Sequence, residues 1–178
     1  MYYQIIQAHK DEIGLAWQFV GNKPQVDYIY LPDSADQLKY KIVKDFREIK
    51  ITARKIPNDI AEQIVKIYQG EKVEFDLSFL NISRLNMFAA KVLKQTCKIP
   101  RGGVDTYSGL ALKIGSPGAA RAVGTALANN PFPLVIPCHR VVRSDGSLGG
   151  FGGGIRMKKE LLQKEGVVFD EKGHIVVK

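Results

Sequence analysis

The hydrophobic pattern of this sequence changes at about residue 85, and this change limits the possible folds more than any other feature. Before it, three short segments alternate apolar and polar residues as half-buried strands do, at 2–9, 12–20 and 25–31. After it, helix-like stretches are broken repeatedly by glycine and proline. We therefore expect an α+β fold, with an N-terminal domain over 1–85 and a mostly helical C-terminal domain over 86–178.

Helix start signals complete the N-terminal half. Asp33 or Ser34 can cap a helix that runs through Lys44, and a second helix is expected over 58–70 after Pro57. We expect the three strands to form a small antiparallel sheet and these two helices to cover it.

In the C-terminal half, the signals predict short helices joined by tight turns. A first helix is expected over 86–98, and Thr106 can cap the next one. The Ser116-Pro117 pair indicates the start of a third helix over 118–129, because proline is tolerated best in the first turn. The last two helices are typical of a helix-turn-helix, although such pairs are also common as plain packing units.

The net positive charge of the chain comes entirely from this second half. Residues 1–85 carry 12 basic and 12 acidic side chains, whereas residues 86–178 carry 14 basic and 6 acidic ones and so account for the whole net charge of +8. A basic surface attracts polyanions. Nucleic acid is therefore a candidate partner, with a solvated basic surface as the alternative.

The helix expected over 118–129 consists mostly of alanine and glycine, with Arg121 near its start. Small residues can simply allow close helix packing. They can also let a helix enter a narrow DNA groove while one arginine projects into the duplex. Because no set of Asn, Gln and Arg side chains is present to read base edges, sequence-specific recognition in the major groove is not expected.

Other classes of protein are excluded by what the sequence lacks. No apolar run is long enough to span a bilayer, and the first residues do not resemble a signal peptide. Cys97 and Cys138 cannot form a disulfide framework, and the three histidines do not have zinc-ligand spacing. We expect an intracellular protein without metal or cofactor, cytoplasmic or, in a eukaryote, nuclear, and not associated with a membrane.

The proline-rich segment before Cys138 predicts a rigid presentation of this cysteine, because three prolines favour an extended path. His139 and Arg140 follow directly. In a strand, the side chains of Cys138 and His139 would point to opposite faces, so their cooperation needs a turn after Pro137 or an intervening water. A lone cysteine is usually an inert buried residue, but this cationic neighbourhood is expected to lower the pKa of the thiol.

The residues around Cys138 resemble the active-site signature of the O6-alkylguanine-DNA alkyltransferases, or methylated-DNA–protein-cysteine methyltransferases: Ile136-Pro137-Cys138-His139-Arg140-Val141-Val142. Upstream, residues 119–124 are similar to the recognition helix of that family, and Asn130-Pro131 precedes the cysteine by the family's spacing. Downstream, residues 149–151 and 159–166 also match. The resemblance covers nearly all of the second half, and the first half only by general plan.

This resemblance implies a DNA-repair protein that acts once. Members bind duplex DNA through the minor groove, rotate an O6-alkylated guanine out of the stack and transfer the alkyl group irreversibly to the cysteine. The implied partner is double-stranded DNA containing O6-alkylguanine, bound by a monomer, and O4-alkylthymine is a further candidate substrate. A thiolate suits this chemistry because the alkyl carbon is an sp³ electrophile.

The resemblance also assigns roles to single residues. The implied catalytic residues are the nucleophile Cys138, the base His139 acting through a water, Glu165, which holds the imidazole, and Asn130, which stabilises the turn before the active-site segment. The implied guanine-binding residues are Tyr107, Leu127, Val141, Phe151 and Gly152. The implied DNA contacts are Tyr107, Ala120, Arg121, Ala122 and Gly124.

Several of these roles are specific. Arg121 would occupy the place of the flipped base, and Tyr107 would push on the target phosphate. The Val141 carbonyl would accept a hydrogen bond from the guanine amine. Tyr107 and the Gly152 amide would donate to the leaving guanine. Many family members have Tyr-Ser where this chain has Phe151-Gly152, so a pair of hydroxyl groups is absent from the expected pocket lip.

Three other functions fit the pattern less well. A protein that recognises O6-alkylguanine without repairing it would lack the cysteine, which is present here as Cys138. A cysteine hydrolase needs an oxyanion hole and has no use for a basic helix-turn-helix. A transcription factor would need a set of base-reading side chains.

Overall fold

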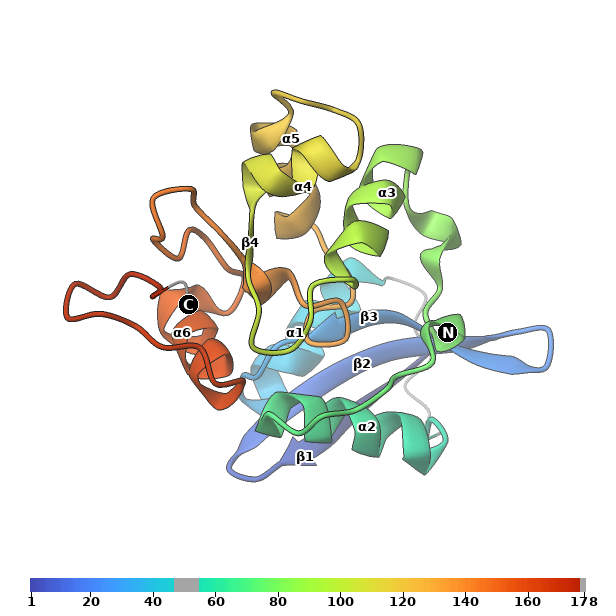
Figure 1. The fold of residues 1–178 in the computed structure, drawn as a ribbon. Coiled ribbons are helices and arrows are strands. Elements are labelled where there is room, and N and C mark those ends of the chain that lie inside the picture. The colour runs from blue at the N-terminus through green and yellow to red at the C-terminus, as the bar shows by residue number, and fades with distance from the viewer. Residues whose placement is uncertain (47–54, 177–178) are drawn as a thin grey trace. The chain divides into compact units, whose positions relative to one another are not determined.

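The computed structural model describes residues 1–46 and 55–176 and confirms the expected α+β fold (Figure 1). The chain forms two compact units. They are Met1–Arg84 with Pro131–Val135, and Leu85–Asn130 with Ile136–Lys178. The expected division into domains 1–85 and 86–178 stays a prediction.

The N-terminal unit is built on a three-stranded antiparallel meander (Figure 1). Its strands are β1 (Tyr2–Ala8), β2 (Asp11–Val20) and β3 (Lys23–Tyr30), in that order. The central strand β2 is buried on both faces, because every residue from Ile13 to Trp17 is buried and alternate residues face opposite sides. The three expected strands are therefore present, within one or two residues of their expected ends.

Helix α1 (Ala35–Asp45) packs against this sheet. Of the two expected caps the chain uses Ser34, whose hydroxyl accepts a hydrogen bond from the Gln37 amide at 3.4 Å. The apolar face of α1 carries Leu38 and Ile42, which are both fully buried. The apolar face of α1 thus packs against the sheet, as the amphipathic pattern of its sequence indicates.

A second helix and two short helical turns complete the unit. Helix α2 (Asn58–Gln69) ends at Gly70, whose φ of 89° is the left-handed conformation that favours glycine at a helix end. The expected range 58–70 therefore matches it. The 3₁₀ turns η1 (Leu77–Phe79) and η2 (Ile82–Arg84) were not predicted, because turns of this length leave no hydrophobic period in a sequence.

The second unit contains the predicted helix-turn-helix. Its helices are α3 (Met87–Thr96), α4 (Tyr107–Lys113), α5 (Ala120–Ala128) and α6 (Gly154–Lys164). Helices α3, α4 and α5 pack against one another. Thr106 caps α4 as expected, because its hydroxyl accepts a hydrogen bond from the Gly109 amide at 2.9 Å.

Helix α5 begins at Ala120, later than the expected start at Gly118. Gly118 has a φ of 85°, which a right-handed helix cannot contain. Residues 116–119 instead form a turn, in which the Ala119 amide donates to the Ser116 carbonyl at 3.1 Å. This turn places Arg121 in the first turn of α5.

The segment before Cys138 is not extended, so that expectation is wrong. Residues 131–136 form bends and turns, and Leu134 has a φ of 73°. Each proline fixes only its own φ, so the residues between them remain free to turn. The turns bring Phe132 into a fully buried position, and the Pro131 carbonyl accepts a hydrogen bond from the Ile29 amide at 2.8 Å. Residues 131–135 of this segment belong to the N-terminal unit.

Two features of the second unit were not predicted from the pattern. The short strands β4 (Asp105–Thr106) and β5 (Val141–Val142) pair in parallel. The residue pattern does not predict helix α6, because glycines around its start interrupt the helical pattern. Only the family resemblance includes part of it, over residues 159–166. Over the two described ranges, no helix has the length and apolar character that crossing a membrane requires.

The cap of α4 yields a first prediction. Thr106→Ala should lower the free energy of unfolding by about 1 kcal/mol, because the Gly109 amide loses its acceptor, whereas Thr106→Ser should keep most of it. Urea unfolding measures the difference. Thr125→Ala is the control, because Thr125 is an exposed threonine inside α5 and caps no helix end. Equal losses for the two alanine variants would contradict the capping role.

Candidate active site

Cys138 lies at the start of a 3₁₀ turn, η3 (Cys138–Arg140), which follows Pro137. From the sequence, cooperation of Cys138 and His139 needs either a turn after Pro137 or an intervening water. The structure has this turn. A 3₁₀ turn has about three residues per turn, so its three consecutive side chains point in different directions. Both Cys138 and His139 are buried.

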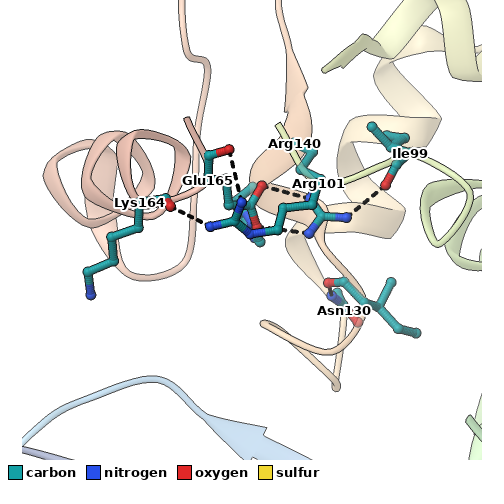
Figure 2. Close-up of polar contacts among 8 residues, drawn as sticks. Ile99, Arg101, Asn130, Arg140, Lys164 and Glu165 are labelled. Atoms are coloured by element: carbon teal, nitrogen blue, oxygen red, sulfur yellow. Dashed lines mark hydrogen bonds and ion pairs between the residues drawn. The ribbon is translucent and has the colours of Figure 1, made fainter. Parts of the chain in front are cut away.

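Glu165 stands just after the end of α6 and pairs with two residues of η3. His139 Nε2 lies 3.0 Å from Glu165 Oε1. Arg140 donates from Nε to Oε2 at 2.9 Å and from Nη2 to Oε1 at 2.8 Å, in the two-pronged geometry that arginine forms with carboxylates (Figure 2). The carboxylate is 8% exposed, so both of its oxygens are held in place within the protein.

The loop before β4 closes on the same helix end (Figure 2). Arg140 Nη1 donates to the Ile99 carbonyl at 2.7 Å, and Arg101 Nη2 donates to the Lys164 carbonyl at 2.7 Å. A Cβ at Gly102 would lie 3.0 Å from the Glu165 carbonyl, so the loop approaches α6 closely. The position of Glu165 is therefore fixed through both its side chain and its backbone.

The pKa shifts of the site follow from burial and pairing. Burial alone would raise the pKa of Glu165, but hydrogen bonds from His139 and Arg140 outweigh it and lower the pKa to about 2. Burial lowers the pKa of His139 despite its contact with Glu165. Burial raises the pKa of the Cys138 thiol. At neutral pH the resting site therefore holds a thiol, a neutral imidazole and a carboxylate.

The expected lowering of the Cys138 pKa by its cationic neighbours is therefore wrong. Arg140 follows in sequence, but its guanidinium pairs with Glu165. Burial has the largest effect on the pKa of the thiol and raises it, although a hydrogen bond with Asn130, the charge of Lys158 and the backbone amides of Cys138 and His139 lower it. A thiol of this kind needs a base before it can react.

The hydrogen bond to Glu165 also fixes which nitrogen of His139 carries the proton. Because a carboxylate can only accept, Nε2 must be the donor, and the lone pair of the neutral ring is on Nδ1. Nδ1 is buried and has no hydrogen-bond partner among the described residues. A basic nitrogen is thus left available in the residue next to Cys138.

Asn130 holds the segment that leads to the cysteine. It is buried, and its Nδ2 donates to the Ile136 carbonyl at 3.0 Å, which ties the end of α5 to the residue two before Cys138. The turn-stabilising role that the family resemblance implies for Asn130 stays a prediction.

Cys138 opens into a cavity of about 740 Å³ within the second unit, a size typical of small-molecule sites. Most residues expected to bind guanine or DNA line it together: Tyr107, Ala120, Arg121, Gly124, Leu127, Phe151 and Gly152. Ala122 does not line it and is exposed on α5. His139, Glu165, Asn130 and Val141 are not among the lining residues either. The site thus has a lined cavity with a polar network behind the cysteine.

Tyr107 packs against two glycines, and only Gly149 leaves no room for a larger side chain. A Cβ at Gly149, where φ is 68°, would lie 2.9 Å from the Tyr107 hydroxyl, and one at Gly124 would lie 3.8 Å from its ring. Burial raises the pKa of Tyr107, so the phenol keeps its proton at neutral pH. It can therefore act as a hydrogen-bond donor inside the cavity.

The sequence reasoning missed several residues of this site. The cavity is also lined by Ser108, Ala128, Arg143, Ser144 and Asp145, and by Gly149 and Gly150, which the family match included without a role. Lys158 is fully buried, and its Nζ donates to the Val141 carbonyl at 2.6 Å. A signal for Lys158 was present, because it precedes Leu161 and Leu162 by three and four residues and so shares their buried helix face.

Cys97 lies outside this site. It does not line the cavity, and burial raises the pKa of its thiol to about 11. Both cysteines are free thiols. No group of three His, Cys, Asp or Glu side chains that could hold a metal ion occurs over residues 1–46 and 55–176.

Comparisons with known proteins identify relatives of the whole chain. A family model described as the DNA-binding domain of 6-O-methylguanine DNA methyltransferase matches residues 87–167. A methylated-DNA–protein-cysteine methyltransferase of Methanosarcina barkeri is 36% identical over 165 residues, which cover 93% of this chain and 97% of that protein. One from Methanothermobacter thermautotrophicus is 46% identical over 108 residues, which cover 61% of this chain and 60% of that protein.

A solved structure gives the same result. The crystal structure of Mycobacterium tuberculosis OGT in complex with DNA superposes with a TM-score of 0.73 at 30% identity, covering 93% of this chain and 92% of that one. The resemblance seen around Cys138 is thereby confirmed and extends to the N-terminal half. The chain belongs to the methylated-DNA–protein-cysteine methyltransferase family.

Proposed function

We propose that this protein repairs DNA by moving the alkyl group from O6 of guanine in a duplex to Sγ of Cys138, once per molecule. The observation that carries the proposal is the placement of Cys138 at the cavity while its neighbour His139 is hydrogen-bonded to Glu165. Membership of the family supports alkyl transfer as the reaction. The related OGT in complex with DNA supports DNA as the partner.

The transfer needs the thiol proton to be removed first. In our proposal, Nδ1 of His139 accepts that proton through a water, and the Glu165 carboxylate stabilises the imidazolium. The thiolate then attacks the alkyl carbon in line, so a sulfur–carbon bond forms as the carbon–oxygen bond breaks. The proton held by His139 returns to the guanine anion that leaves.

The leaving guanine is stabilised by donors at the cavity. The Tyr107 hydroxyl and the Gly152 amide are placed among the lining residues and would donate to the negative charge that develops. Leu127 and Phe151 would provide the apolar wall for the base. The contact of the Val141 carbonyl with the guanine amine stays a prediction from the family resemblance, because Val141 is fully buried, does not line the cavity and already accepts a hydrogen bond from Lys158.

In our proposal the guanine leaves the base stack to react, and the burial of Cys138 supports this step. The cysteine is 8% exposed at the cavity, which a stacked base cannot reach. Arg121 is exposed in the first turn of α5 and would occupy the gap in the duplex. Ala120, Ala122 and Gly124 would let the backbone of α5 approach the minor groove closely.

The product is a thioether, and no second thiol lines the cavity to release it. We therefore propose a monomer that reacts once, with O4-alkylthymine as a further candidate substrate. Since DNA is the partner, the protein would act inside the cell, in the cytoplasm or in a eukaryotic nucleus.

Intact-mass measurement tests the reaction directly. After incubation with excess duplex containing O6-methylguanine, each protein molecule should gain one methyl group, located on Cys138 by peptide mapping. Cys138→Ala should bind the duplex and gain none, and the control Cys97→Ala should still gain one. Repeated turnover, or a methyl group on Cys97, would refute the proposal.

Arg121→Ala separates base flipping from chemistry. The variant should slow repair in a duplex about tenfold or more, because unstacking costs a few kcal/mol, and should react with free O6-benzylguanine within about twofold of the unmodified protein. Arg156→Ala is the control, since Arg156 is 93% exposed on α6 and lies outside the cavity. If the two substrates lost rate equally with Arg121→Ala, Arg121 would not act in flipping.

A further inference from the structure

We propose that Arg143 binds a DNA phosphate beside the flipped guanine, and that a hairpin formed by residues 167–176 holds Arg143 in place at the mouth of the cavity. This inference rests on the proposed function. It adds a DNA contact and a supporting segment, neither of which touches the alkyl group that is transferred.

Arg143 stands at the mouth of the cavity with an unpaired charge. The residue lines the cavity and is nevertheless exposed, so it lies where the cavity meets the solvent. Over residues 1–46 and 55–176, no carboxylate forms an ion pair with its guanidinium. The carboxylate nearest in sequence, Asp145, instead accepts hydrogen bonds from the Ser147 amide at 2.9 Å and the Ser147 hydroxyl at 2.6 Å. The guanidinium is therefore available to an anion from outside, and its planar fork matches a phosphate.

In the proposed reaction, the anion that reaches this position is a phosphate of the DNA backbone. When a guanine enters the cavity as far as Cys138, the backbone of its own nucleotide stays at the mouth. Arg121 of α5 and Arg143 both line the cavity, whereas Asp145 is the single acidic residue among the described residues that line it. This surplus of positive charge suits a polyanion. Because Arg121 would fill the gap in the duplex, Arg143 is the arginine left to bind the backbone.

A tight turn directly after β5 presents Arg143. Its carbonyl accepts a hydrogen bond from the Gly146 amide at 3.0 Å, and its amide donates to the Ser147 carbonyl at 2.9 Å. Gly146 has a φ of 83°, so the turn has the pattern of a three-residue hairpin loop whose last residue is left-handed. The backbone of Arg143 is thus held at both its carbonyl and its amide.

The hairpin 167–176 packs against this turn. Within the hairpin, Phe169 and Ile175 form an antiparallel bridge. The Ile175 amide donates to the Gly146 carbonyl at 3.1 Å, and the Ile175 side chain is 9% exposed. Its buried cluster includes residues on both sides of the turn: Val142, Leu148, Leu162 and Val167. None of residues 167–176 lines the cavity, so the hairpin acts on the cavity only through the turn.

Uncharged phosphates test the contact with Arg143. Binding to a duplex containing O6-methylguanine is measured with the full-length protein carrying Cys138→Ala, which prevents transfer. In separate duplexes, each phosphate that flanks the lesion is replaced by a methylphosphonate. At one position this replacement should weaken binding about tenfold, because a charge-assisted hydrogen bond is lost. Adding Arg143→Ala should weaken binding to the all-phosphate duplex by a similar factor and should remove the sensitivity at that position.

The salt dependence and a second arginine complete this experiment. Arg143→Ala should make the slope of log affinity against log salt concentration shallower by about one, as expected for one phosphate contact. Arg156→Ala is the matched control and should keep the full sensitivity to methylphosphonate, because Arg156 is 93% exposed and lies outside the cavity. If Arg143→Ala were as sensitive as the parent protein at every flanking phosphate, the proposed contact would be wrong.

A double-mutant cycle tests the support that the hairpin gives. Ile175→Ala should weaken binding about fivefold, because the turn loses its packing, but should cost nothing more when Arg143→Ala is already present. Val176→Ala is the matched control, since Val176 is the next residue and is 46% exposed. Urea unfolding establishes that each variant is folded, and Ile175→Val enters the same cycle if Ile175→Ala is not. Losses that multiply, or an unchanged affinity of the Ile175 variant, would overturn the role of the hairpin.

Failure of the proposed function would look different. The protein with Cys138 intact would then gain no methyl group in the intact-mass measurement, whatever its affinity for these duplexes. A gain of one methyl group together with unaltered binding by Arg143→Ala would leave the proposed function standing and would overturn this inference alone.

Discussion

The site depends above all on the pair between Arg140 and Glu165. The two residues are 25 positions apart, and their two-pronged contact joins the turn that carries Cys138 to the end of α6. A carboxylate that is 8% exposed would otherwise be destabilised by burial and would tend to take up a proton. With Arg140 in place it stays ionised, and Oε1 remains available to orient His139. The loop around Ile99 and Gly102 then holds both partners of the pair.

A thiol that is used once does not need to be ionised all the time. Burial keeps Cys138 protonated at rest, and a protonated, buried thiol is protected from the oxidation that a thiolate invites. The base His139 and the charge of Lys158 then make ionisation accessible when the cavity is filled. In this account, reactivity comes from groups arranged around the sulfur and not from a permanently low pKa.

Local features of the fold could be predicted from the sequence, whereas contacts between distant residues could not. The strands, the caps at Ser34 and Thr106 and the helix-turn-helix follow from short patterns of residue types. The pairing of Arg140 with Glu165 leaves no such pattern, so the nearby sequence suggested that Arg140 acts on Cys138. Lys158 was missed because a charged residue on a helix is expected to face solvent. The family resemblance predicted a role for Glu165, but not that Arg140 would bind its carboxylate.

The protonation state of His139 tests the central claim most directly. Nitrogen-15 NMR of the labelled full-length protein at pH 7 reports whether each ring nitrogen carries a proton. The account predicts a neutral ring protonated on Nε2 alone, because Nε2 donates to Glu165 and burial disfavours the charged form. Protonation of both nitrogens, together with a Cys138 thiolate, would show a permanent ion pair in the resting protein and would contradict it.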